Sequence, residues 1–154
     1  MATLINNATN YKSCTFSAHP SVQMANATGD ATVAQITLDT AVINEGSHFS
    51  TVGSSYTVPF TGNYLIAMDI KLSGILNTHT VGQCTVYVDG AAALALMFFQ
   101  PYNVAAGGTT LTVSGNSIFS LTAAEVLTFI VKIEGGNKVV NIEPESYVMG
   151  TFIL

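Results

Sequence analysis

Apolar and polar residues alternate along two segments of the chain. Every second residue from Tyr64 to Leu72 is apolar, and the same holds from Leu127 to Ile133. A spacing of two places alternate side chains on opposite faces of a β-strand, whereas an amphipathic helix repeats its apolar positions at spacings of three and four. The pattern therefore predicts two strands that each bury one face.

Turn residues separate further short apolar runs. Asp89-Gly90 lies between two such runs and suits a tight hairpin, whose central residues need positive φ. Glycine-rich turn signals also stand at 105–110 and 134–138. These boundaries predict strands near residues 13–18, 33–39, 54–59, 63–73, 80–88, 92–99, 109–113, 117–121, 126–134, 138–143 and 146–153. Short strands at this spacing are typical of an all-β sandwich or jelly roll, here of about ten antiparallel strands.

The composition limits the partners of this chain. Its 154 residues are 49% apolar and only 8% charged, with four lysines, no arginine and nine acidic residues. A chain without arginine lacks the bidentate donor for phosphates and guanine edges, and a net charge of −5 repels a polyanion. We therefore predict no nucleic-acid partner. With so few charges, part of the apolar surface is expected to be covered by another copy of the chain.

No targeting or membrane-inserted segment is predicted. The start, MATLINNATN, has neither basic residues nor an apolar stretch, and the apolar run 91–99 is too short to cross a bilayer as a helix. Cys14 and Cys84 are too few for a disulfide framework and are interpreted as two unpaired thiols. Residues 1–13 are polar and unpatterned, so they are predicted to be an N-terminal arm before one domain over 14–154.

The most specific motif lies within residues 44–66. It reads NEGSHF at 44–49 and YTVPFTGNYLI at 56–66. It resembles the signature of complement C1q globular heads, approximately Asn-x-Gly-x-His-Tyr followed by aromatic-x-x-Pro-x-x-Gly-x-Tyr-x-Phe. The positions that match in order and spacing are Asn44, Gly46, His48, Phe49, Tyr56, Pro59, Gly62 and Tyr64, while Ile66 replaces the usual phenylalanine.

Later segments resemble the same family in the same order. They are TVYVDGAAA (85–93), SGNSIFSLTAAEVLTFIV (114–131) and SYVMGTFIL (146–154), the last with Gly150 and Phe152. Ala124-Glu125 stands where the family usually has Gly-Asp. The resemblance implies a C1q/tumour necrosis factor-like jelly roll that forms a homotrimer. It further implies that inner-sheet aromatic residues build the core or approach the threefold axis, and the candidates are Phe16, Tyr64, Phe129 and Phe152.

Residues that could carry chemistry are few. His19, His48 and His79 lack the spacing of metal ligands, and pairing Cys14 with His19 does not supply it, so no zinc site is predicted. No Gly-x-Ser-x-Gly elbow occurs. Glu143 and Glu145 flank Pro144 and are interpreted as a solvated edge rather than a catalytic pair.

No cofactor is predicted, with one alternative left open. The resemblance implies that a loop calcium site could exist, because some members of the family bind calcium through loop carboxylates and carbonyls. Asp30, Glu45 and Asp89 are the loop candidates, although the chain has no Asp-x-Asp-x-Asp run.

Two classes of function remain after these exclusions. The first is a non-enzymatic, homotrimeric structural protein of a virion surface, either a phage capsid decoration (cement) protein or the tip of a head or tail fibre. The few charges, the threonine- and asparagine-rich surface and the lack of a signal favour this class, with residues 1–13 docking on a capsid or fibre protein. The alternative is an extracellular or cell-surface recognition head that binds a host protein or a glycan. An enzyme is not predicted, because no polar cluster has catalytic spacing.

Overall fold

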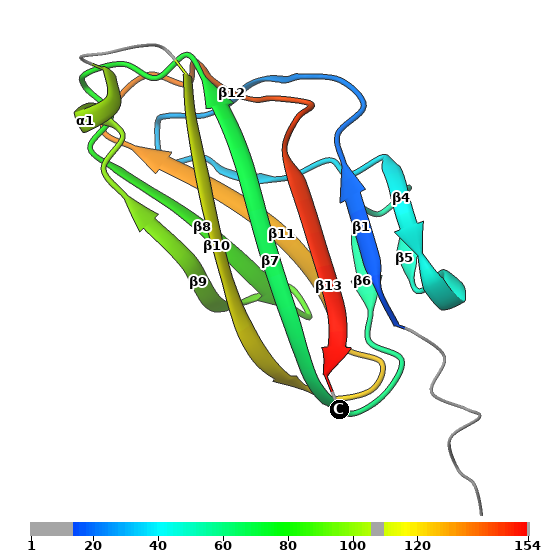
Figure 1. The fold of residues 1–154 in the computed structure, drawn as a ribbon. Coiled ribbons are helices and arrows are strands. Elements are labelled where there is room, and N and C mark those ends of the chain that lie inside the picture. Colours follow the sequence, from blue (N-terminus) through cyan, green and yellow to red (C-terminus); the bar gives the residue numbers. More distant parts are fainter. Residues whose placement is uncertain (1–13, 106–109, 154) are drawn as a thin grey trace, which may run out of the picture.

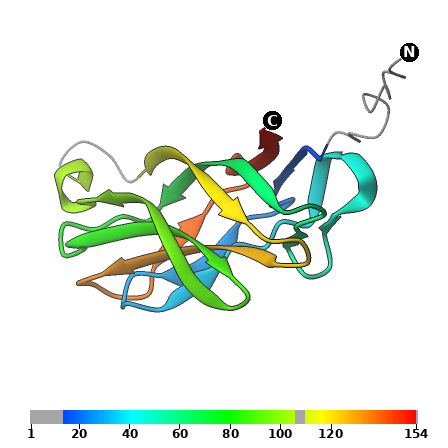
Figure 2. The same cartoon turned by 90° about the horizontal axis from the view of Figure 1, so that it is seen from below.

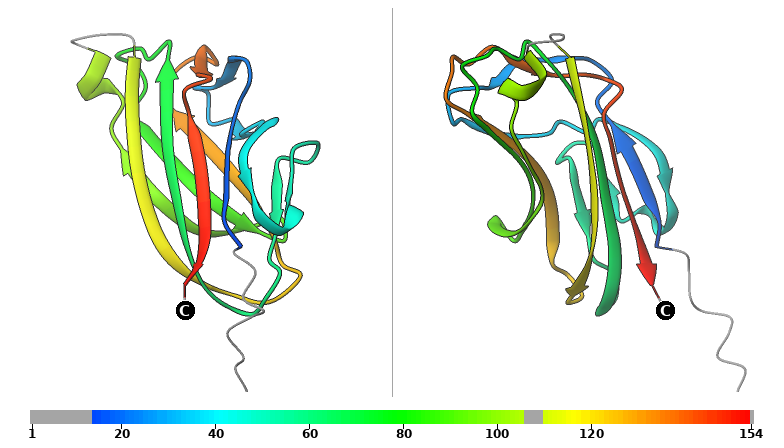
Figure 3. Two further views of the ribbon diagram at one scale, coloured as in Figure 1. Left: turned by 45° about the vertical axis from the view of Figure 1, so that its right-hand side comes forward. Right: turned by 60° about the vertical axis from the view of Figure 1, so that its left-hand side comes forward.

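Two antiparallel β-sheets lie face to face in the computed structural model, which describes residues 14–105 and 110–153 (Figure 1). The right-hand view of Figure 3 shows the two layers most clearly. Within the described residues the regular structure is almost entirely strand, so the predicted all-β jelly-roll sandwich is confirmed. The predicted arm, residues 1–13, lies outside the described residues.

Sheet A is built around β7, which has twelve residues. β10 pairs with one edge of β7 along its whole length, while β13 and β12 share the other edge. The sheet then continues from β13 to β1 and β4, and from β12 to β2. Its strands are β1 (Phe16–His19), β2 (Met24–Thr28), β4 (Thr40–Asn44), β7 (Gly62–Ser73), β10 (Thr110–Leu121), β12 (Val140–Ile142) and β13 (Tyr147–Ile153).

Sheet B has β11 at its centre. β11 pairs with β8 on one edge, and with β6 and β3 on the other. β9 forms one border of the sheet by pairing with β8. Its strands are β3 (Val33–Gln35), β5 (Phe49–Ser50), β6 (Ser55–Thr57), β8 (Val81–Val88), β9 (Ala91–Phe99) and β11 (Val126–Glu134). The short helices α1 (Tyr102–Ala105) and η2 (Glu45–Ser47) lie at opposite sides of the sandwich (Figure 2).

The core lies between the two sheets, and the alternating segments supply much of it. The apolar face of β7 is buried, as predicted, through Tyr64, Ile66, Met68, Ile70 and Leu72. β11 buries its matching face through Leu127, Phe129, Val131 and Ile133. Full burial of one such side chain stabilises a fold by about 1.5–3 kcal/mol, so these two rows contribute a large share of the driving force.

One pair of predicted strands was wrong. The segments 109–113 and 117–121 are not separate, because β10 runs through Ser114–Asn116 in unbroken register with β7. Gly115 lies in the middle of β10, where a Cβ would come within 2.4 Å of Met97 Cγ, so glycine allows β9 and β10 to approach each other.

Two strands of sheet A were not predicted at all. β2 and β4 are short and lack an alternating pattern, and they form by pairing with β12 and β1. Their strand conformation therefore depends on partners distant in sequence. In the ranges that the structure describes, no helix has the length and apolar character that a bilayer crossing requires.

Candidate functional site

The first part of the family-like motif closes a loop between the sheets. The Asn44 side chain donates from Nδ2 to the carbonyl oxygen of Phe49, and its Oδ1 accepts from the Phe49 N–H, both at 2.9 Å. Gly46 has φ 73°, and a Cβ there would lie 2.6 Å from His48 Nε2. Loop closure thus explains two residues of the motif: Asn44 satisfies the backbone of Phe49, and Gly46 adopts a positive φ where a Cβ would be crowded.

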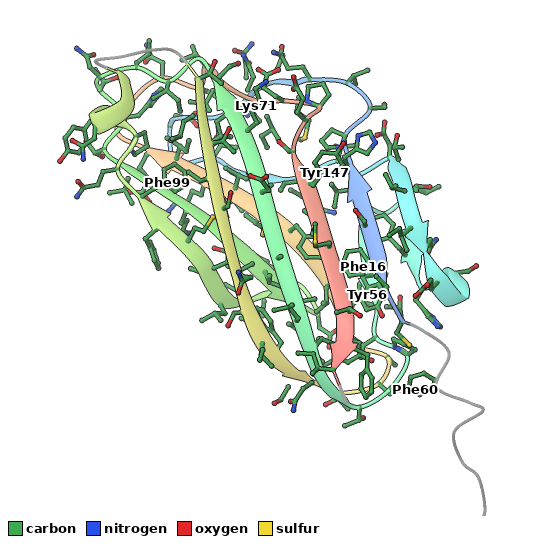
Figure 4. All side chains as sticks on the ribbon, in the orientation of Figure 1. Phe16, Tyr56, Phe60, Lys71, Phe99 and Tyr147 are labelled. Carbon is green, nitrogen blue, oxygen red and sulfur yellow. The ribbon has the colours of Figure 1, made fainter. Side chains whose placement is uncertain are left out.

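The loop places an aromatic ring into a larger cluster. The Phe16 ring is stacked against Tyr56 and Phe49, with centroid distances of 4.4 and 5.3 Å, and it lies 5.9 Å from Phe129 (Figure 4). Tyr56 also contacts Tyr64 edge-on at 6.3 Å. Offset and edge-on contacts are the favoured arrangements of aromatic rings, and they join both sheets at this end of the sandwich.

The second part of the motif forms the turn into β7. The turn follows Pro59, and the Tyr64 hydroxyl donates to the carbonyl oxygen of Phe60 at 2.8 Å and accepts from its N–H at 3.3 Å. A Cβ at Gly62 would lie 2.5 Å from the Phe152 ring, which packs edge-on against Tyr64 at 5.2 Å. These residues therefore hold the start of β7 against the end of β13.

The aromatic residues that were candidates for a trimer contact pack instead in or against the core of one subunit. Phe16, Tyr64 and Phe129 are fully buried, and Phe152 is half-buried against the core. Gly150 lies beneath Phe16, where a Cβ would come within 2.4 Å of Phe16 Cε1. A surface for another copy must consequently be sought among other residues.

Burial also suppresses ionisation in this region. It raises the pKa of Tyr56, whose hydroxyl donates to the carbonyl oxygen of Cys14 at 3.1 Å, and it raises the pKa of Tyr64. Burial, with a smaller contribution from Glu45, raises the pKa of the Cys14 thiol. Burial alone raises the pKa of the Cys84 thiol to about 12. Neither cysteine has the lowered pKa of a nucleophile.

The three histidines occupy separate sites. His19 has its Nδ1 2.8 Å from the carbonyl oxygen of Pro20, and His48 meets Tyr56 edge-on. His79 is fully buried, with Nδ1 accepting from the Leu76 N–H and Nε2 3.1 Å from the carbonyl oxygen of Asn137. Across the described ranges, no three His, Cys, Asp or Glu side chains gather in a group that could hold a metal ion.

The three calcium candidates lie in different loops. Asp30 accepts from the Thr32 hydroxyl, which lowers the pKa of this carboxyl. Glu45 accepts from the Thr15 N–H at 3.3 Å, and Asp89 accepts from the Val126 N–H at 2.9 Å. Each carboxylate therefore accepts from a different part of the chain, and the arrangement differs from the shared oxygen cage that calcium needs.

Glu143 and Glu145 also have different partners. Glu145 forms an ion pair of 2.8 Å with Lys71, while Glu143 accepts from Gln23 and from the Ser73 hydroxyl. The two carboxylates thus stabilise strand ends and do not form an acid–base pair.

One group superficially resembles a catalytic relay. His19, Ser21 and Asp39 lie at the same end of the sandwich, but the Ser21 hydroxyl donates to Asp39 at 2.5 Å, and His19 Nδ1 faces Pro20. In a nucleophilic triad the histidine lies between the serine and the carboxylate. The observed hydrogen bonds instead link the turn after β1 to Asp39, which precedes β4.

The surface feature that sequence analysis missed is the outer face of sheet A, the side turned away from sheet B. Its side chains alternate with the core residues of β7, β10 and β13. The uncharged members at its centre are Leu65, Ala67, Asn116, Ile118, Met149 and Thr151. Two shallow hollows open on it, of about 200 Å³ beside Gly115 and about 110 Å³ beside Gly150. The sequence did offer one indication of this face, because Leu65 and Ala67 are apolar residues on the side of the predicted strand that points away from the core.

No family model matches the sequence, and no curated protein matches it. Solved structures do resemble it. Murine APRIL at pH 8.0 superimposes with a TM-score of 0.65 at 14% identity, covering 92% of this chain and 100% of that one. The globular domain of zebrafish complement 1qA gives a TM-score of 0.56 at 14% identity, covering 91% and 97%. The chain therefore has the C1q/tumour necrosis factor-like jelly-roll fold.

Proposed function

We propose that this chain is a non-enzymatic surface module that works as a homotrimer, with the outer face of sheet A as part of the subunit contact. The observation that carries the proposal is an uncharged, partly apolar sheet face that one copy leaves exposed. Ile118 is 61% exposed there, Met149 46% and Leu65 36%. Contiguous exposed apolar residues of this kind mark interaction surfaces.

The apolar residues of this face are aligned across three strands. Ile118 lies opposite Leu65, and Leu65 lies opposite Thr151. In the next row, Ala67 lies between Asn116 and Met149. The side chains in these adjacent rows are small or of medium size, which supports close packing against another protein surface.

Charged groups are confined to one end of this face. Asp69 accepts from the Ser114 hydroxyl at 2.8 Å, and beyond it Lys71 is paired with Glu145. Depletion of charge at the centre with polar groups at the rim is the usual composition of a protein interface.

A second uncharged region lies at the border of the sandwich where β9 and β10 meet. Neither strand contains a charged residue, and each pairs with only one neighbour within the described part of the chain. Long edge strands normally carry charges that prevent association. Two different uncharged surfaces on one chain support a heterologous contact, in which one surface of a copy packs against the other surface of the next copy. Such contacts close into a ring when the rotation between copies is suitable.

The proposed location is the surface of a virion, as a capsid decoration protein or fibre tip. The low charge content and the polar, uncharged surface residues support it. An extracellular recognition head is the alternative, and the described fold suits both. Electron microscopy of the native assembly would separate the two, because a decoration protein would appear as threefold density on a capsid or fibre.

The homotrimer is tested by light scattering of the full chain in low and high salt. We expect a mass near three chains in both, because an apolar contact is not screened by ions. Leu65→Asp should yield folded monomers. Val52→Asp is the matched control, since Val52 is 99% exposed in a turn away from this face. A monomeric wild type would refute the trimer, and a trimeric Leu65→Asp variant would refute the assigned contact.

A further inference from the structure

An open hollow lies where β8 begins and β9 ends, at the corner of the sandwich that carries α1. Its volume is about 440 Å³, and it is lined by Val81, Phe98, Phe99, Gln100 and Asn103. Binding sites for small ligands commonly occupy roughly 300–1,000 Å³ and combine apolar walls with a few fixed polar groups. Figure 4 labels Phe99 at this end of the molecule.

The apolar wall includes an unusually exposed ring. Phe98 is 72% exposed, and in the register of sheet B it lies opposite Gln83 while its neighbour Met97 is buried. The Phe98 ring therefore points away from the core, on the side of sheet B that faces away from sheet A. A ligand at this position would lie away from the outer face of sheet A, while Phe98 belongs to β9, which borders the second proposed contact surface.

Two side-chain amides beside the ring are held in place. Gln100 Oε1 accepts from Asn103 Nδ2 and from the Tyr102 hydroxyl, both at 3.0 Å. These bonds leave the Gln100 amide N–H groups and Asn103 Oδ1 without a partner in the described residues. The hollow thus presents one donor group and one acceptor in a fixed relative position.

The lining carries no charge. The neighbouring strand β11 places Glu134 opposite Val81, but Glu134 is ion-paired with Lys132 at 2.5 Å. An anionic or cationic ligand would therefore find no counter-charge in the hollow. The ligand that fits is neutral, with an apolar face for the ring and hydroxyl groups for the amides.

We propose that this hollow, formed by Val81, Phe98, Phe99, Gln100 and Asn103, binds a neutral saccharide. The C–H face of a pyranose would pack on the Phe98 ring, and adjacent hydroxyls would accept from Gln100 and donate to Asn103. An exposed aromatic ring with adjacent amides offers both contacts at low entropic cost, because the amides are already oriented. This site goes beyond the proposed trimer, and its binding is measured separately from the oligomeric state.

The test is saturation-transfer NMR and calorimetric titration of the full chain with maltotriose and chitotriose, and with sialyllactose as a charged comparison. We expect a neutral oligosaccharide to bind, and Phe98→Ala and Gln100→Leu each to weaken its affinity roughly tenfold. Leu94→Ala is the matched control on the same strand, since Leu94 is also exposed, and it should bind normally.

Both variants change exposed side chains, so thermal unfolding should match the wild type. The proposal is overturned if neither neutral sugar binds, if sialyllactose alone binds, or if both variants retain wild-type affinity. Light scattering on the same samples reports the oligomeric state separately, so failure of the trimer and failure of the saccharide site give different results.

Discussion

The side-chain amide of Asn44 and the backbone of Phe49 exchange two hydrogen bonds of 2.9 Å across the η2 loop. This contact positions Phe49 for its stack on Phe16. Asn44→Ala removes both bonds, and we expect it to lower the free energy of unfolding by about 1–2 kcal/mol. Urea denaturation followed by fluorescence measures this. Asn77→Ala is the control, because Asn77 is exposed and should tolerate the change. Equal stability of the two variants would contradict the role of Asn44.

Gly150 leaves no space for a side chain. A Cβ would lie 2.4 Å from Phe16 Cε1 and 2.7 Å from Ile66 Cδ1, both in the packed core. We expect Gly150→Ala to destabilise the fold by about 1–3 kcal/mol through overpacking. Gly53→Ala is the comparison, because its nearest neighbour is the mobile end of Ser55 at 3.1 Å. Thermal unfolding measures both variants. A larger loss of stability for Gly150→Ala than for Gly53→Ala is expected, and equal losses would contradict the role of the Phe16 contact.

Thr85 Oγ1 is buried and has no hydrogen-bond partner within the part of the chain that the structure describes. An unsatisfied buried hydroxyl is costly, and valine replaces it with a methyl group of similar size. Thr85→Val should therefore raise the free energy of unfolding by about 1 kcal/mol. Thr85→Ser, which keeps the hydroxyl and loses the methyl group, should lower it. A destabilised valine variant in chemical denaturation would indicate that the hydroxyl has a partner.

Cys84 is expected to be unreactive in the native protein. Because burial raises its pKa to about 12, its thiolate fraction at pH 8 is about one in ten thousand, and it increases as the pH rises toward 12. Labelling with a chromogenic disulfide reagent at pH 8 should be slow in buffer, and both thiols should react at once in denaturant. In the Cys84→Ser variant Cys14 is the remaining cysteine, so its labelling rate can be measured separately from that of Cys84. Rapid native labelling of the Cys14→Ser variant would contradict the burial of Cys84.

The candidate site was only partly predictable. The contacts of Asn44 with Phe49 and of Tyr64 with Phe60 are local, so the motif that contains them was recognisable in the sequence. Some carboxylate partners could not be predicted because they come from distant parts of the chain, as with Thr15 for Glu45 and Val126 for Asp89. The hollow beside Phe98 was not predicted, because it depends on how Gln100 and Asn103 fold against the end of β9.

The sequence by itself determined the all-β class and the facing of β7 and β11, because alternation along a strand is a local property of an extended backbone. It did not determine that β10 is one continuous strand. Gly115 interrupts the apolar pattern there, and the reason for a glycine is the close approach of Met97 from the other sheet. Nor did it determine the uncharged outer face of sheet A. Leu65, Ile118 and Met149 lie far apart in the chain, and only the hydrogen-bonded register of β7, β10 and β13 brings them into adjacent rows.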